Sequence, residues 1–145
     1  VWLGVALAAF WFPFELRLEE TWLQQRWQQA WHVPFYNYYQ GSEFHALNEL
    51  LRKLLFFLPG GLLWSLHVAG EFPWRRPALM RAGAACLPLV AVLVEAGQLL
   101  MPGKYADITD VCIEAGGAWL GLLLGRRLWL DAGRRAAAPV AAWAA

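Results

Sequence analysis

The sequence predicts an all-α membrane protein: a single domain of 145 residues, built as a bundle of four transmembrane helices with an amphipathic segment between the first and the second. Hydrophobic residues make up 59% of the chain, and it contains stretches too apolar for a soluble domain of this size. The apolar residues also gather into four runs, most of them near the roughly 20 residues that cross a bilayer. These two observations favour a membrane protein.

The four runs are the predicted spans, and they cover residues 1–14, 47–69, 78–100 and 106–125. The first is the shortest and the chain starts inside it at Val1, so we expect a truncated or tilted span in a piece of a longer protein. The start of the chain has neither the basic region nor the small-residue cleavage site of a signal peptide. The second run contains Pro59 followed by two glycines, which a bundle tolerates as a kink.

A polar segment, residues 15–46, separates the first two runs. Leu23, Trp27 and Trp31 recur in it at helical spacing opposite polar side chains. This pattern predicts an amphipathic helix lying at the headgroup level of the membrane. The stretch PFYNYYQGSEF that follows indicates a turn or loop, and a plain connector packed on the bundle is the alternative.

Basic residues set the expected orientation in the membrane. Three arginines lie in the loop at residues 70–77 or at the start of the run after it, and four follow the last run. They are Arg75, Arg76, Arg81, Arg126, Arg127, Arg134 and Arg135. We therefore expect this loop and the C-terminus on the cytoplasmic side, and residues 15–46 and 101–106 outside. The alanine-rich residues 136–145 predict a weakly ordered tail.

Composition argues against several classes of protein. A formal net charge of +1 is too small for a strongly basic nucleic-acid-binding protein, so no nucleic-acid partner is expected. The sequence has no zinc-finger spacing, phosphate-binding glycine loop or Ser/His/Asp set, and we predict neither a metal nor another cofactor. Its two cysteines, Cys86 and Cys112, lie in separate spans, so we expect small core residues rather than a disulfide.

The stretch from Glu95 to Glu114 carries ionisable side chains in two adjoining spans and in the Pro-Gly turn between them. Charged groups at membrane depth are costly unless they are paired or face a wet cavity, so they are functional candidates. Glu49 and His45, near the start of the second span, are close enough in the chain to join them. The candidate ligand-binding residues are Asn48, Arg52, Lys53, Glu95, Gln98, Lys104, Asp107, Asp110 and Glu114.

Acids and glycines share one face of the fourth run. They step by three or four residues, from Asp107 through Asp110, Glu114 and Gly117 to Gly121. Small residues at this spacing let helices approach closely in lipid, and Gly125 extends the pattern. This face should therefore pack on another helix, and it is also a surface through which copies of the chain could associate.

The third run repeats the pattern, with small residues deep in the span and polar residues near its outer end. Its members are Ala84, Pro88, Ala91, Glu95 and Gln98. We expect the faces of the third and fourth runs to meet. Arg52 and Lys53, in the first turns of the second run, place cations at the depth of the acids.

Structural roles compete with this interpretation. Asp107 and Asp110 suit an N-cap and the dipole of a helix start. The two cations of the second run can reach the outer interface without touching an acid. Glu95 and Glu114 can form a buried ion pair or hydrogen bond with no role in ligand binding.

At these residues the sequence resembles the VanZ-like family of small bacterial membrane proteins. The family pattern has a Glu and a Gln three apart, a Gly-Arg turn, two Asp three apart and a helix with spaced glycines. It is matched here by Glu95, Gln98, Gly103, Asp107, Asp110, Gly117 and Gly121. Asn48, Pro59 and Gly60 follow the second-span pattern, so the resemblance covers residues 48–125.

Two positions depart from the family pattern. Lys104 stands where Arg is usual, which keeps the charge but loses the planar fork that grips a carboxylate or phosphate bidentately. Glu114 stands where Asn is common, which adds a charge. The resemblance implies a multi-pass protein of the bacterial cytoplasmic membrane, in a family named for low-level teicoplanin resistance and without an established catalytic mechanism.

Three functions are compatible with these features. The leading one is a polar pocket near the outer membrane face that binds an envelope or lipid-linked ligand, with a role in teicoplanin resistance or another envelope process. The second is an intramembrane enzyme, in which Glu95 or Glu114 is a general base and Asp107 and Asp110 hold a divalent metal. The third is a proton- or ion-coupled transporter, which is less favoured because no internal repeat is visible.

Overall fold

The computed structural model describes residues 1–30, 43–71 and 76–142. Every regular element in these ranges is an α-helix. The helices are α1 (Trp2–Trp11), α2 (Glu20–Ala30), α4 (Glu43–Glu71), α5 (Arg76–Leu99) and α6 (Ile108–Ala142). The predicted all-α class is therefore confirmed. Most of the loop predicted after the amphipathic segment lies outside the described residues.

Three of the helices are long and apolar enough to cross a membrane: α4 over Glu43–Gly70, α5 over Pro77–Leu99 and α6 over Ile108–Ala132. Helix α1 is apolar but has only 10 residues, about 15 Å, half the thickness of the hydrocarbon core. The predicted count of four spans is thus not confirmed. The described residues give three spans and a short apolar helix packed on them.

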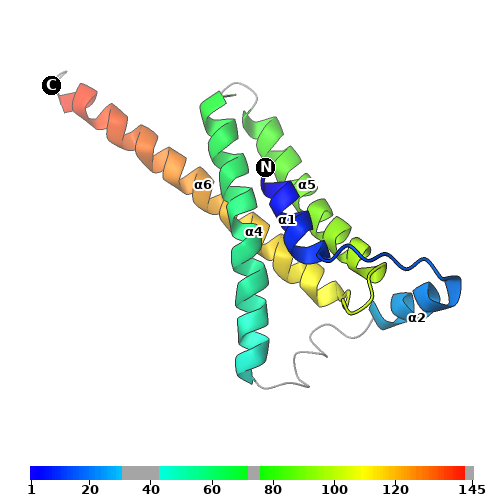
Figure 1. The fold of residues 1–145 in the computed structure, drawn as a ribbon. Coiled ribbons are helices and arrows are strands. Elements are labelled where there is room, and N and C mark those ends of the chain that lie inside the picture. The colour runs from blue at the N-terminus through cyan, green and yellow to red at the C-terminus, as the bar shows by residue number, and fades with distance from the viewer. Residues whose placement is uncertain (31–42, 72–75, 143–145) are drawn as a thin grey trace.

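Figure 1 shows how the helices are arranged: α1 lies against α4 and α5, and α6 crosses α4. We call the end of the bundle where α5 ends and α6 begins, residues 100–107, the turn end. Helix α4 begins at this end as well, and α2 lies beside the last residues of α5 there. All the candidate polar residues therefore come from segments that meet at or near the turn end.

Helix α6 continues through Ala142, past residue 136, where the sequence predicted a weakly ordered tail. Alanine has the highest helix propensity, so an alanine-rich stretch readily extends an existing helix. With 35 residues, α6 is about 52 Å long, which exceeds the roughly 30 Å hydrocarbon core of a bilayer. Its C-terminal half runs beyond the other helices (Figure 1).

The closest helix contact joins α6 to α4 along the predicted glycine face, which we call the glycine seam (Gly117, Gly121 and Gly125). A Cβ added at Gly117 would overlap the carbonyl oxygen of Leu54, and one at Gly121 would overlap that of Leu58. The absence of side chains thus lets the two backbones touch. Because α4 covers this face within the chain, an association between copies through it would require α4 to leave.

Helix α4 runs without interruption through Pro59. The two glycines after this proline have a packing role. A Cβ at Gly60 would press on the Trp2 ring, and one at Gly61 would overlap the backbone of α6 at Ala118. The glycines therefore admit α1 on one side and α6 on the other.

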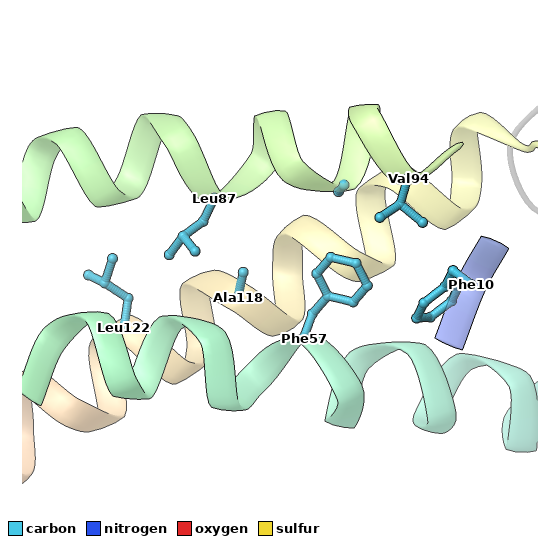
Figure 2. Packing of buried hydrophobic residues seen from close by; sticks show 7 residues of the cluster. Phe10, Phe57, Leu87, Val94, Ala118 and Leu122 are labelled. Atoms are coloured by element: carbon cyan, nitrogen blue, oxygen red, sulfur yellow. The ribbon is translucent and has the colours of Figure 1, made fainter. Parts of the chain in front are cut away.

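The hydrophobic core fills the space between α1, α4, α5 and α6 (Figure 2). Phe57 of α4 is fully buried at its centre, with Phe10 and Trp2 of α1 edge-on to its ring at centroid distances of 5.7 and 5.4 Å. Edge-to-face contacts of this kind add to the stabilisation from burial. The remaining buried members are Leu87, Ala91, Val94, Ala118 and Leu122.

Three tryptophans fasten helices to one another, each by a hydrogen bond to a backbone carbonyl and by contact with a glycine. Trp2 donates to Phe56 at 3.3 Å, Trp11 to Val94 at 3.0 Å and Trp64 to Leu79 at 3.0 Å. Their rings cover Gly60, Gly97 and Gly83, respectively, where a Cβ would collide with the indole. An indole N–H away from water requires an acceptor, and the neighbouring helix supplies it.

The prediction that Cys86 and Cys112 are core residues is wrong, because both are exposed. Each is followed directly by a buried residue, Leu87 or Ile113, so the helical turn directs the thiol away from the core. On a membrane-spanning helix these positions face lipid, where a small apolar thiol is well tolerated.

Replacing Gly121 with Ala should destabilise the protein by about 1–3 kcal/mol, because the new methyl group forces α6 away from the Leu58 carbonyl. Gly116→Ala is the matched control, since a Cβ there meets nothing within 4 Å while the gain in helix propensity is the same. Unfolding in detergent micelles measures both variants. Equal stabilities would contradict the close contact.

Candidate functional site

A tight turn joins α5 to α6 and sets the geometry of the site. The backbone N–H of Lys104 donates to the Met101 carbonyl at 3.3 Å, and Gly103 between them has φ of 76°. Pro102 followed by a glycine with positive φ is the pattern of a type II turn, which glycine adopts without strain. The turn brings the end of α5 beside the start of α6 and presents Lys104 between them.

Asp107 is the N-cap of α6. Its Oδ1 accepts a hydrogen bond from the backbone N–H of Thr109 at 2.8 Å, which satisfies a donor of the first turn. The backbone N–H of Asp107 itself donates to Oε2 of Glu95 on α5 at 3.0 Å. The polar faces of α5 and α6 therefore meet, as predicted, and the capping alternative for Asp107 is correct.

Asp110, one turn further along α6, has a different partner. Its Oδ2 forms an ion pair with Nζ of Lys53 on α4, and both side chains are buried, Lys53 to 8% exposure and Asp110 to 6%. Lys53 therefore does not reach for the membrane surface. The pair joins α4 to α6 just beyond the glycine seam, and each charge compensates the other away from water.

Arg52 behaves unlike its neighbour. Its Nη2 lies 2.7 Å from Oε2 of Glu49, one turn earlier on α4, and the side chains of the pair are 54% and 30% exposed. The guanidinium also lies over the Phe10 ring of α1, 5.8 Å from its centroid. An exposed pair of this kind contributes little stability and can exchange partners.

Two carboxyl groups lie deeper in the bundle. Glu114 is fully buried and Glu95 is 4% exposed. Within the described part of the chain, neither oxygen of Glu114 has a hydrogen-bond partner, and Oε1 of Glu95 has none. Burying polar atoms without partners is costly, so these groups are the least compensated part of the cluster.

An open cavity of about 600 Å³ lies at the turn end. Six of the nine candidate residues line it: Arg52, Lys53, Gln98, Lys104, Asp107 and Asp110. Glu95 and Glu114 are not in its wall, and the exposed Asn48 is not either. The lining also includes His45, Glu49 and Tyr105, together with Ala9, Phe10, Ala46 and Gly103. Contributions from α1 could not be found in the sequence, because no polar pattern marks Phe10.

Lys104 is the charged lining residue whose side chain makes no ion pair or hydrogen bond with the described residues. It is half-buried at the rim, three residues before the N-cap. Its ammonium group is therefore available to a ligand.

Helix α2 lies beside the turn end, an arrangement that the amphipathic pattern did not predict. Arg26 lies over the rings of Trp22 and Tyr105, at 5.4 and 5.1 Å, and donates to the backbone carbonyl of Gln98 at 3.4 Å. Partial burial lowers the pKa of Arg26 below its ordinary value. Before α2, the backbone N–H of Arg17 donates a hydrogen bond to the carbonyl of Leu100, the residue after the end of α5. The segment thus supports the turn from outside the cavity.

The described residues contain no group of three or more His, Cys, Asp or Glu side chains arranged to hold a metal ion. The proposed metal ligands Asp107 and Asp110 have other partners, the Thr109 backbone and the Lys53 ammonium group. This arrangement gives no support to the metal-dependent enzyme among the three functions.

The family model described as VanZ/LLP1 matches residues 1–130. The chain belongs to the VanZ/LLP1 family. No curated protein and no solved structure matches it. In this VanZ/LLP1 protein the match includes α1 and α2 as well as the motif-bearing helices, so the short first helix and the segment over the turn end belong to the family domain.

Lys53→Met should destabilise the protein by about 3–5 kcal/mol, because it leaves the Asp110 carboxylate buried without its cation. The double variant Lys53→Met/Asp110→Leu should recover much of this loss. Arg52→Gln, which breaks the exposed pair with Glu49, should cost at most about 1 kcal/mol. A double-mutant cycle by unfolding in detergent tests this, and additive single effects would contradict a buried pair.

Asp107→Ala should cost about 0.5–2 kcal/mol through loss of the helix cap. Asp107→Asn keeps an oxygen acceptor in the same place and should be close to the parent protein. The same unfolding measurement distinguishes the two variants. If Asn is as damaging as Ala, the charge rather than the cap determines stability at this position.

Proposed function

We propose that this VanZ/LLP1 protein binds a lipid-linked component of the bacterial cell envelope in the cavity at the turn end. The observation that carries the proposal is the mixed lining of the cavity. Charged side chains from α4 and from the α5–α6 turn form one part, and Ala9, Phe10 and Ala46 form another. A site with both kinds of surface suits an amphiphile with a polar head and an apolar chain.

The distribution of basic residues supports placing the turn end on the outer side of the cytoplasmic membrane. Arg81 lies near the start of α5, at the opposite end of that helix from the turn. The exposed Arg126 and Arg127 lie in the second half of α6, also far from the turn. Arginines gather on the cytoplasmic side of bacterial membrane proteins. The cavity would then face the compartment in which envelope precursors are used.

A role in susceptibility to teicoplanin follows as a proposal from this placement and from family membership. A protein that binds a lipid-linked envelope component changes the amount of that component available at the outer membrane leaflet. Glycopeptide antibiotics act at that surface, so bound ligand and drug susceptibility should change together. Both can be measured on the same set of variants.

The test uses two variants, Ala9→Trp and Ala46→Trp, which fill part of the cavity with a bulky ring. Each should lower both the amount of lipid retained by the purified protein in native mass spectrometry and any change in teicoplanin susceptibility of cells that express it. Membrane insertion should stay intact. Ala132→Trp, at an exposed position in the second half of α6, is the matched control and should have no effect. Unchanged lipid retention and susceptibility in both variants would contradict the proposal.

A further inference from the structure

We infer that the polar group received by this cavity is an anion of the phosphate or diphosphate class, bound by Lys104 with Arg52 as a second contact. The inference rests on the proposed function and specifies the chemistry of the ligand. It follows from the partners of each charged side chain in the lining.

The acids of the lining are engaged within the chain. Glu49 pairs with Arg52 at 2.7 Å, and Asp110 pairs with the buried Lys53. Asp107 accepts the backbone N–H of Thr109 as the cap of α6. None of the three is therefore positioned to attract a cationic ligand, because a second cation would have to displace a partner that is already in contact.

The cations are engaged to different degrees. Lys53 is held by Asp110 in the bundle and is needed there. Arg52 is half-exposed in a pair whose contribution to stability is small, so a ligand can compete for its guanidinium. Lys104 has no partner among the described residues. The charge left available at the cavity is thus positive, and it lies on an ammonium and a guanidinium group, the two side chains that bind phosphate groups.

The position of Lys104 favours a bound anion over a role in folding. The type II turn fixes its backbone, and Gly103 beside it has open space around it. The Lys104 side chain makes no ion pair or hydrogen bond with the described residues, so its replacement should leave the fold intact. A change in ligand affinity at this position can therefore be read directly.

The experiment measures binding of three probes to the full chain in nanodiscs of phosphatidylcholine. Farnesyl diphosphate carries both an apolar chain and the anion, farnesol carries the chain alone, and inorganic pyrophosphate carries the anion alone. We expect farnesyl diphosphate to bind most tightly. Lys104→Gln should weaken its binding about tenfold or more, the effect of losing one charged contact. Lys104→Arg should keep the affinity, and Arg127→Gln, an exposed cation outside the cavity, should not change it.

The outcomes separate this inference from the proposed function. If farnesol binds as tightly as farnesyl diphosphate, the anion site is wrong while binding of a lipid-linked component stands. If pyrophosphate binds as tightly as farnesyl diphosphate and Lys104→Gln weakens both, the anion site is supported and the lipid-linked ligand is contradicted. If Lys104→Gln leaves the affinity for farnesyl diphosphate unchanged, the assignment of Lys104 is overturned. Absence of binding by all three probes would contradict both proposals.

Discussion

The contact between the backbones of α4 and α6 is the constraint on which the rest of the structure depends. In a bilayer, apolar side chains gain little by leaving lipid for another helix, so close packing decides which helices associate. Gly117 and Gly121 permit carbonyl oxygens of α4 to approach the α6 backbone, and Gly61 permits the reverse approach from α4. This interlocking fixes the register of the two helices, and a shift along the seam would bring a side chain against a backbone.

The register places Lys53 opposite Asp110, and this makes a cluster of charges tolerable at the end of the bundle. Once that pair is formed, the α5–α6 turn can carry its own acids, because Asp107 caps α6 and Glu95 holds the Asp107 backbone. The cavity is what remains between these engaged groups and α1. Its available positive charge is thus a result of which acids the fold has already used.

Much of this could be predicted from periodicity. The spacing of Asp107, Asp110, Glu114 and the glycines identified the buried face of α6, and three of the four apolar runs predicted as spans correspond to helices long enough to cross a membrane. Partners could not be predicted, because Lys53 and Asp110 are far apart in the sequence and meet only through the seam. The contacts of tryptophans with glycines, and those of α2 with Tyr105 and Gln98, could not be predicted either, because they also join residues that are far apart in the sequence. The two cysteines were wrongly predicted to be core residues, because a shift of one residue along a helix turns a side chain from the buried face to an exposed one.

Magic-angle-spinning NMR of the protein in lipid bilayers, with ¹⁵N-labelled lysine and ¹³C-labelled aspartate, tests the central claim most directly. The chain has only two lysines and three aspartates, so a Lys104→Gln sample suffices to assign Lys53. The structure predicts a strong through-space correlation between Nζ of Lys53 and the carboxylate carbon of Asp110. A folded, helical sample in which Lys53 correlates with no aspartate carboxylate would contradict the register of α4 and α6, and with it the account of the cavity.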